Sequence, residues 1–180
     1  LDELLTNNDP AVSDLEYVCL IPDSQKRAIN PNWKRIKLQA VGRFNGNLWE
    51  QIDLPVACRG YLLLSLTNTG PAFYANQVIV IHDMSVYRVP DAYSFMFKLK
   101  YKFIYKMLAR RCRKIITVSE FSRNEISSLL DLDTGKIQVI YEGREHALRP
   151  VPDNNVLDKF ALKSDPYLLC VGSRSKHKNI

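Results

Sequence analysis

The sequence lacks the features that mark several classes of protein. Only four of its 180 residues are cysteine, and their spacing contains no C-x-x-C pair or other zinc-ligand pattern. Three scattered histidines also argue against a metal site. No apolar run approaches the roughly 18–20 residues that a membrane-spanning helix needs. We therefore expect no metal, no disulfide framework and no membrane span, and we expect the chain to lie in the reducing cytoplasm.

What the sequence contains is ordinary for a folded domain, with a surplus of positive charge. Hydrophobic residues make up 46% and charged residues 24% of the chain, which excludes a disordered or low-complexity protein. The formal net charge is +6. The chain begins at Leu1 without a basic-then-apolar leader and ends at Ile180 just after the expected entrance to a helix. We therefore expect it to be a fragment of a longer protein.

Short apolar runs recur along the chain, and helical segments separate many of them. Several runs are continuous and not alternating, which favours strands covered on both faces, as in a parallel sheet. This alternation predicts an α/β fold with a Rossmann-like, doubly wound parallel sheet. The expected strands are residues 15–21, 36–41, 61–66, 78–81, 115–118, 137–141 and 167–171. The expected helices are residues 2–5, 48–57, 92–113 and 120–132.

The longest expected helix carries much of the positive charge. Eight basic residues and no acidic residue lie between Lys98 and Lys114. Two interpretations stay open for them: a solvated helix face, or a surface that binds membrane headgroups or a phosphorylated acceptor. The basic residues grouped on one face are Lys98, Lys102, Lys106, Arg110 and Arg113. The residues expected on the core face are Tyr93, Phe97, Tyr101, Ile104, Tyr105, Leu108 and Cys112.

Ligands of an open α/β sheet bind beyond the carboxyl ends of its strands, so residues that directly follow strands are the candidates for chemistry. An imidazole at such a place can hydrogen-bond a sugar hydroxyl or move a proton, although a local aspartate cap beside an incidental histidine also explains His82-Asp83. The cations and hydroxyls after Gly172 suit a phosphate or diphosphate, or form only a solvated basic loop. The candidates are Asn68–Pro71, His82-Asp83, Ser119-Glu120, Glu142-Gly143 and Gly172–Lys178.

Motifs for several other activities are incomplete. The loop after Gly172 lacks the second glycine and the G-K-[ST] of a Walker phosphate-binding loop. Asp131-Leu132-Asp133 has the D-x-D spacing of a metal–nucleotide-sugar site, but turn and capping chemistry explains it better. A serine hydrolase would need G-x-S-x-G, which is missing. No helix-turn-helix, zinc-finger or RNA-binding signature is present, so we expect no nucleic-acid partner.

Taken together, the second half of the chain resembles glycosyltransferase family 4, whose members are retaining glycosyltransferases of the GT-B fold. The likeness is strongest to bacterial mannosyltransferase-like members that assemble polysaccharides. It covers residues 77–179 well and residues 1–76 only in the order of elements. It rests on VIVIHDMSVYRVPDAYS, a long helix, RKIITVSEFSRNEI, KIQVIYEG, a proline-containing linker and YLLCVGSRSKHKN, in that order.

The resemblance implies two Rossmann-like lobes facing a cleft, of which this chain holds one and the start of the other. Residues 1–149 would form the acceptor-side N-terminal lobe without its first strand, and residues 150–166 the linker. Residues 167–180 would form the first strand and loop of the donor-binding lobe. The whole protein would be a hexosyltransferase that moves a sugar, mannose by this likeness, from a nucleotide-sugar to a glycan or lipid-linked acceptor. We expect the 180 residues alone to be inactive.

The resemblance also implies roles for individual residues. His82 would be catalytic, lying against the transferred sugar, with Asp83 holding its loop. Ser119, Glu120 and Gly143 would line the cleft. No cofactor and no metal is implied, because cationic side chains and helix dipoles stabilise the departing diphosphate. The residues expected on the donor diphosphate are Gly172, Ser173, Arg174 and Lys178.

Two functions of different kinds therefore stay open. The first is a cytoplasmic sugar transferase attached peripherally to the inner face of a membrane. The second is a non-catalytic Rossmann-like module that binds an anionic membrane or nucleic acid through its basic helix. Sequence beyond residue 180 would separate them, since a second lobe with two glutamates eight residues apart is expected only of the enzyme.

Overall fold

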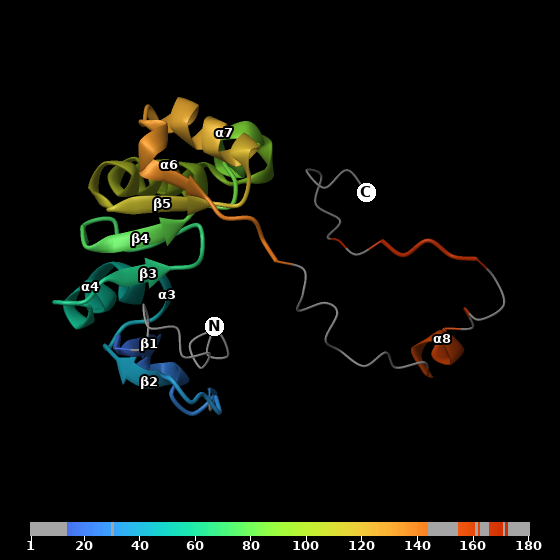
Figure 1. The fold of residues 1–180 in the computed structure, drawn as a ribbon, viewed down its shortest axis with the longest axis horizontal. Helices are drawn as coiled ribbons and strands as arrows, with labels where there is room; N and C mark the ends of the chain where they lie inside the picture. Colours follow the sequence, from blue (N-terminus) through green and yellow to red (C-terminus); the bar gives the residue numbers. More distant parts are fainter. Residues whose placement is uncertain are drawn as a thin grey trace.

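All described strands are parallel, and helices connect most of them (Figure 1). The computed structural model describes residues 14–29, 31–143, 155–160, 162, 166–170 and 172. A two-stranded sheet precedes a four-stranded sheet in which the strands follow one another in chain order. This alternation of parallel strands and helices confirms the predicted Rossmann-like α/β class. The strands are β1 (Tyr17–Pro22), β2 (Ile36–Val41), β3 (Leu63–Ser65), β4 (Gln77–Val80), β5 (Lys114–Thr117) and β6 (Ile137–Val139).

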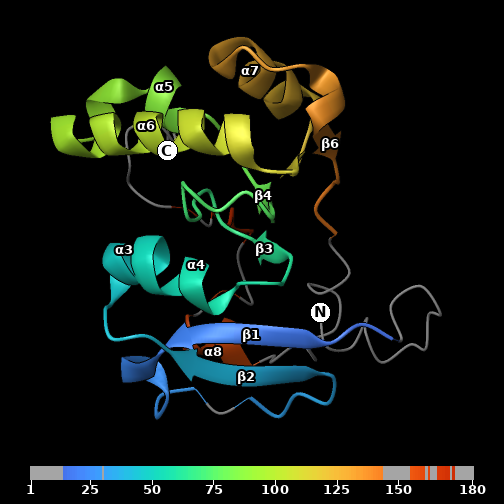
Figure 2. The same cartoon turned by 90° about the vertical axis from the view of Figure 1, so that its left-hand side faces the viewer.

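The six strands form two sheets and not the single sheet that we expected. In both ribbon views β1 lies between β2 and β3, yet β1 pairs only with β2 and β3 only with β4 (Figures 1 and 2). β3 is short, and apolar side chains along and beside it stay uncovered. Leu62, Leu64 and Leu66 are between 46% and 57% exposed. The edge of the four-stranded sheet at β3 is therefore apolar and has no strand partner among the described residues.

Helices of very different length separate the strands. Between β2 and β3 a π-helical turn, Trp49–Asp53, joins two short helices into one segment. The long helix after β4 starts later than predicted, because Pro90–Ala92 forms a separate 3₁₀ turn. The hydroxyl of Ser94 then accepts a hydrogen bond from the backbone N–H of Phe97 at 3.3 Å and caps the helix. The helices are α3 (Gly46–Leu48), α4 (Leu54–Ala57), α5 (Ser85–Arg88), α6 (Phe95–Arg111), α7 (Glu120–Leu130) and α8 (Asn155–Lys159).

The core lies between the four-stranded sheet and helices α5, α6 and α7. Ile79 and Ile115 of adjacent strands are fully buried, as are Leu108 of α6 and Ile126 of α7. Burial raises the pKa of the Tyr105 phenol well above its usual range, and the nearby Asp83 charge adds to the effect. The phenol therefore stays neutral in this core. The core is lined by apolar side chains of β4 and β5. The continuous apolar runs of these two strands therefore predicted buried strands correctly.

The predicted core face of the long helix is largely correct. Ile104, Tyr105, Leu108 and Cys112 are buried. Tyr93 and Tyr101 are partly buried and pack against the same cluster. Phe97 is the exception, because it lies at the rim and is 36% exposed. Aromatic rings four residues apart contact one another along this face, with the Phe97 and Tyr101 centroids 4.2 Å apart.

Three expectations concern the ends of the chain. The expected strand 167–171 belongs to a second lobe and stays a prediction; the described residues 166–170 have no regular structure here. No strand covers them, and Leu168 is fully exposed. The expected linker, residues 150–166, contains helix α8. The expected helical residues 2–5 lie outside the described part of the chain.

All four cysteines are free, as predicted. Which of them are buried differs from our expectation. Sequence context placed Cys19 and Cys170 in the interior. Cys19 is only half-buried, and Cys170 is exposed because its segment packs against no sheet. Cys58 and Cys112 are the buried thiols, and burial raises the pKa of Cys58 to about 11.

Candidate functional site

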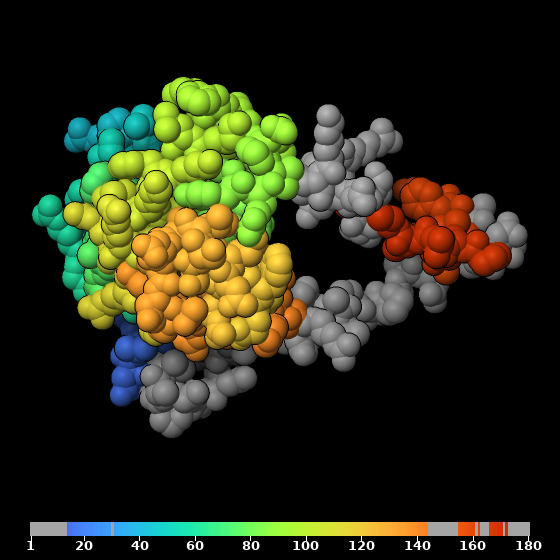
Figure 3. Space-filling view, turned by 90° about the horizontal axis from the view of Figure 1, so that it is seen from above, coloured from blue at the N-terminus to red at the C-terminus, as the bar shows by residue number. Residues whose placement is uncertain are grey.

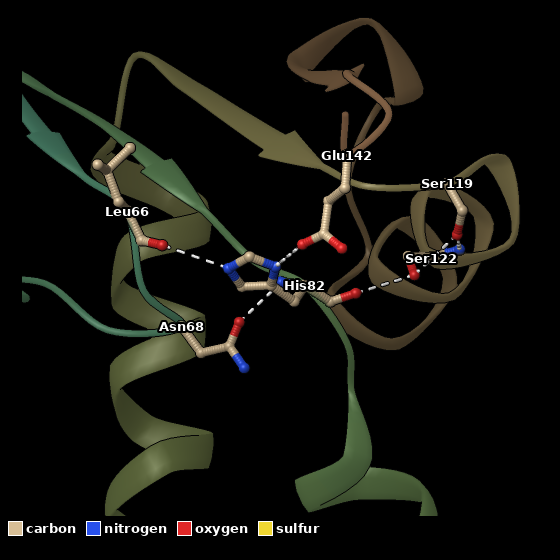
Figure 4. Close-up of polar contacts among 6 residues, drawn as sticks. All are labelled: Leu66, Asn68, His82, Ser119, Ser122 and Glu142. Carbon is tan, nitrogen blue, oxygen red and sulfur yellow. Dashed lines mark hydrogen bonds and ion pairs between the residues drawn. The ribbon is translucent and has the colours of Figure 1, made fainter. Parts of the chain in front are cut away.

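Polar groups that follow three of the strands, and one from helix α7, meet at one edge of the four-stranded sheet (Figure 4). β3 to β6 are parallel, so their carboxyl ends lie at the same edge. Residues that follow β3, β4 and β6 supply Asn68, His82 and Glu142, and α7 supplies Ser122. His82 lies at the centre and contacts all the others, so we call these four residues the His82 cluster.

The backbone of His82 is held from both sides. Its N–H donates a hydrogen bond to the side-chain oxygen of Asn68 at 2.7 Å. Its carbonyl accepts a hydrogen bond from the hydroxyl of Ser122, a buried residue of α7, at 3.0 Å. These bonds join the ends of β3 and β4 to the first turn of α7. They fix the place from which the imidazole projects.

Both ring nitrogens of His82 face oxygen acceptors. Nε2 lies 3.2 Å from the carbonyl oxygen of Leu66, and Nδ1 lies 3.4 Å from Oε1 of Glu142. A protonated ring can donate to both, whereas a neutral ring can donate to only one. The His82 side chain is 39% exposed and that of Glu142 71% exposed, so the cluster is open to solvent. An imidazole fixed at an open sheet edge can hydrogen-bond a bound hydroxyl or exchange a proton with it.

Asp83 lies where we expected it, next to His82, and its carboxylate holds the following turn. Oδ1 accepts a hydrogen bond from the backbone N–H of Ser85 at 2.8 Å, at the start of α5. A bond from an aspartate side chain to the backbone two residues on is an Asx turn, a local structural role of the kind that the dipeptide suggested. The contact supports the expectation that Asp83 orders the loop after β4. It does not bring the carboxylate to the ring of His82.

Ser119 and Glu120 begin α7, as the sequence predicted. The hydroxyl of Ser119 accepts a hydrogen bond from the backbone N–H of Ser122 at 3.1 Å and caps the helix. Glu120 forms an ion pair with Arg123 in the same helix at 2.7 Å. Ser119 therefore adjoins the His82 cluster through Ser122, while the ion pair of Glu120 is local to α7.

The sequence did not predict that Asn68, Ser122 and Glu142 contact His82. Asn68 and Glu142 followed predicted strands, but no motif distinguished them from turn residues. Only the glycine of Glu142-Gly143 was assigned to the cleft, and Gly143 is exposed beside the carboxylate that reaches His82. Ser122 lies three residues after the cap residue Ser119. The S-x-x-S spacing was the available signal, since it puts both hydroxyls on the first turn of α7.

The structure brings together only the first of the two predicted sites. Of the expected diphosphate-binding residues, Gly172 is exposed, while Ser173, Arg174 and Lys178 lie outside the described residues. Along the basic helix, Lys98 and Lys102 are half-buried, and Lys102 Nζ lies 4.9 Å from the centroid of the Tyr87 ring. Lys106, Arg110 and Arg113 are exposed.

Within the described ranges, no helix combines the length and the apolar character that crossing a bilayer requires. Among the residues whose structure is described, no three His, Cys, Asp or Glu side chains form a group able to hold a metal ion.

Comparison with known proteins gives the family of the chain. A curated relative, the O-antigen chain mannosyltransferase RfbU of Salmonella typhimurium, is 33% identical over 147 residues. The match covers 82% of this chain but spans only 38% of that relative. No solved structure matches the chain significantly. The model of Glycosyltransferase Family 4 matches residues 18–148, a segment that includes the whole His82 cluster. The chain belongs to glycosyltransferase family 4.

Proposed function

We propose that the whole protein is a hexosyltransferase that moves a sugar from a nucleotide-sugar to a glycan or lipid-linked acceptor in O-antigen synthesis. Family membership supports the class of reaction, and the similar mannosyltransferase supports mannose as the sugar. The observation that carries the proposal is the His82 cluster, in which residues after β3, β4 and β6 and one residue of α7 fix an imidazole at an open edge of the sheet.

In this proposal His82 contacts a hydroxyl of the transferred sugar. The Leu66 carbonyl belongs to the backbone and keeps Nε2 in place. Glu142 is the more exposed partner, and its contact with Nδ1 is the longer of the two. A sugar hydroxyl would therefore exchange with Glu142 and not with Leu66. Nδ1 faces this exposed carboxylate, so that side of the ring is open to solvent and a sugar hydroxyl can reach it.

The donor diphosphate would be bound from the other lobe by the loop of Gly172, Ser173, Arg174 and Lys178. Cationic side chains and backbone amides at a helix start would stabilise the charge of the leaving nucleoside diphosphate. Transfer would then proceed with retention and without a metal. Changing Lys178 to Ala should weaken nucleotide-sugar binding in titration calorimetry. Lys176→Ala, in the same loop, is the matched control, and equal affinities of both variants would remove Lys178 from the donor site.

The proposal is tested by a donor screen on the full-length protein. Purified enzyme is incubated with nucleotide-sugars and an acceptor, with and without a chelator, and the product is analysed by mass spectrometry and by NMR of the anomeric proton. The proposal expects transfer from a nucleotide-mannose, retained configuration and no loss of rate with the chelator. Inverted configuration or a strict metal requirement would contradict the mechanism, and the absence of product with every donor would contradict the function.

A second candidate is a non-catalytic module that binds an anionic membrane. The specific observation in its favour is the exposed cationic and apolar surface of α6. A full-length protein that binds anionic vesicles but yields no product with any donor would support the module over the enzyme. If the enzyme is correct, the same surface fits a cytoplasmic transferase attached peripherally to the membrane.

A further inference from the structure

The outward face of α6 carries large apolar side chains that no described residue covers. Phe95, Met96, Leu99 and Phe103 are 72%, 70%, 56% and 52% exposed. A spacing of four residues places Phe95, Leu99 and Phe103 in one row along the helix, with Met96 beside it. The buried residues of α6 lie on the opposite side, against the core. α6 is therefore apolar on two faces, and only one of them is used for folding.

A residue from outside the helix extends this row. The ring of Phe73, in the loop between β3 and β4, has its centroid 6.4 Å from that of Phe103. Phe73 is itself 63% exposed, and the guanidinium of Arg111 lies 5.4 Å from its ring. The α6 outer patch is therefore formed by Phe73, Phe95, Met96, Leu99 and Phe103.

Cations surround the α6 outer patch, and α6 itself contains no acidic residue. Lys106 and Arg110 continue the face of Leu99 and Phe103 over the next two turns, and both are exposed. Figure 3 shows atoms of α6 uncovered at the surface beside α7. The cationic residues of the helix are Lys98, Lys100, Lys102, Lys106, Arg110 and Arg111.

The combination of apolar and cationic residues indicates which kind of partner binds the α6 outer patch. The core of a protein–protein interface is depleted in lysine, whereas this patch has lysines on both sides of its apolar row. A helix with aromatic, leucine and methionine side chains among lysines and arginines suits the headgroup region of an anionic bilayer. There the apolar groups enter the acyl boundary and the cations meet lipid phosphates. We propose that the α6 outer patch docks the protein onto an anionic lipid bilayer by inserting Phe95, Leu99 and Phe103.

The orientation of α6 brings the apolar end of the patch to the candidate site. α6 connects the parallel strands β4 and β5, so it runs back along the sheet and begins at the edge where His82 lies. The hydroxyls of Ser85 and Tyr93 hydrogen-bond at 2.9 Å and join the loop after His82 to the start of the helix. Docking would therefore hold the site edge near the headgroups, where a lipid-linked acceptor presents its sugar. This last consequence rests on the proposed function, whereas docking itself does not.

Vesicle sedimentation of the full-length protein tests the proposal. Vesicles of phosphatidylcholine with 30% phosphatidylglycerol, on the order of physiological anionic content, are compared with vesicles of phosphatidylcholine alone. We expect binding to the anionic vesicles, weakened by added salt, and little binding to the neutral ones. Because no sugar donor is present, the result is independent of transferase activity, which is measured separately with a water-soluble acceptor.

Two pairs of variants separate the contributions of charge and insertion. Lys106→Glu with Arg110→Glu should lower vesicle affinity by at least about twenty-fivefold, which corresponds to about fivefold per basic residue. Its charge-matched control is Lys26→Glu with Arg27→Glu, two exposed residues of another turn. Leu99→Ser should lower vesicle affinity about tenfold. Leu15→Ser is its control, because Leu15 is 57% exposed and Leu99 is 56% exposed.

The outcomes decide the proposal. Loss of binding in both α6 variants, with both controls binding normally, supports it. The proposal is overturned if the unmodified protein stays in the supernatant, if it binds neutral vesicles equally well, or if the α6 variants bind like their controls. Concentration-dependent dimerisation that Leu99→Ser abolishes, without any vesicle binding, would assign the patch to a second copy of the chain and also overturn the proposal. Circular dichroism of each variant reports whether it is folded.

Discussion

At the scale of single residues, His82 is distinguished by how many elements fix it. Its backbone is bonded to Asn68 and Ser122, and its ring lies against Leu66 and Glu142. Each of these contacts alone is ordinary. Together they hold one imidazole at an open edge of the sheet. Such an arrangement restricts the ring to a small set of orientations, which is what a positioned hydrogen-bonding group requires.

Changing His82 to Ala in the full-length protein should lower kcat/KM for sugar transfer by about 100-fold, the lower end of what one acid–base or hydrogen-bonding group contributes. The ring is partly exposed, so its loss should leave the urea midpoint of unfolding nearly unchanged. Rates come from product release in a coupled assay, and stability from circular dichroism. Wild-type kinetics in the folded variant would remove His82 from the site.

Glu142 should act only through His82, and a double-mutant cycle shows whether it does. Because the sugar hydroxyl is proposed to displace Glu142 from Nδ1, Glu142→Ala alone should change kcat/KM by no more than about tenfold in either direction. It should change the free energy of unfolding by less than about 1 kcal/mol, because the pair is exposed. In the His82→Ala background the same change should have no effect on kcat/KM. Additive losses in the double variant would show that Glu142 contacts the substrate independently.

At the scale of elements, the first turn of α7 serves both the helix and the site. Ser119 caps the helix, and Ser122 binds the backbone of His82. Ser119→Ala removes the N-cap and should lower the free energy of unfolding by about 1 kcal/mol, measured by urea denaturation. Ser128, exposed within the same helix, provides the control. Ser128→Ala should be neutral or slightly stabilising, since alanine favours helix interiors. Equal effects of the two changes would argue that the Ser119 cap contributes nothing.

The elements that the sequence predicted well are those whose signals, apolar runs and capping residues, lie within the element itself. Strands β4 and β5 are largely apolar runs that helices and neighbouring strands cover, and α7 has its cap and turn signals in sequence. The expected strand 167–171 stays a prediction, because a strand needs a partner and the described residues 166–170 have no regular structure. A hydrophobic run alone cannot show whether a partner is in reach.

The candidate site was predictable to the same limited degree. Strand periodicity placed His82 at a sheet edge, because the residue after a buried strand must lie there. The contacts of Asn68, Ser122 and Glu142 depend on loop conformations that bring together residues up to 60 positions apart, from 82 to 142. The outward apolar row of α6 was also missed, since apolar residues on a helix are ordinarily assigned to the core.

At the scale of the whole molecule, the proposed function needs two sides of a site, of which the described residues would supply one and a second lobe the other. The match spans only 38% of the mannosyltransferase relative. We therefore expect a polypeptide of these 180 residues to yield no transfer product and to bind no nucleotide-sugar in titration calorimetry. The full-length protein under the same conditions is the control. Donor-dependent product from the 180 residues would contradict this expectation.

Among the described residues, the edge of the four-stranded sheet at β3 has no strand partner, and this has a consequence for handling the protein. Unpaired backbone groups flanked by Leu62, Leu64 and Leu66 are a template on which any extended chain can add a strand. A polypeptide that leaves this edge bare should aggregate as its concentration rises, with growth of β-sheet signal and thioflavin fluorescence. The yield of soluble protein would therefore report how completely β3 is covered.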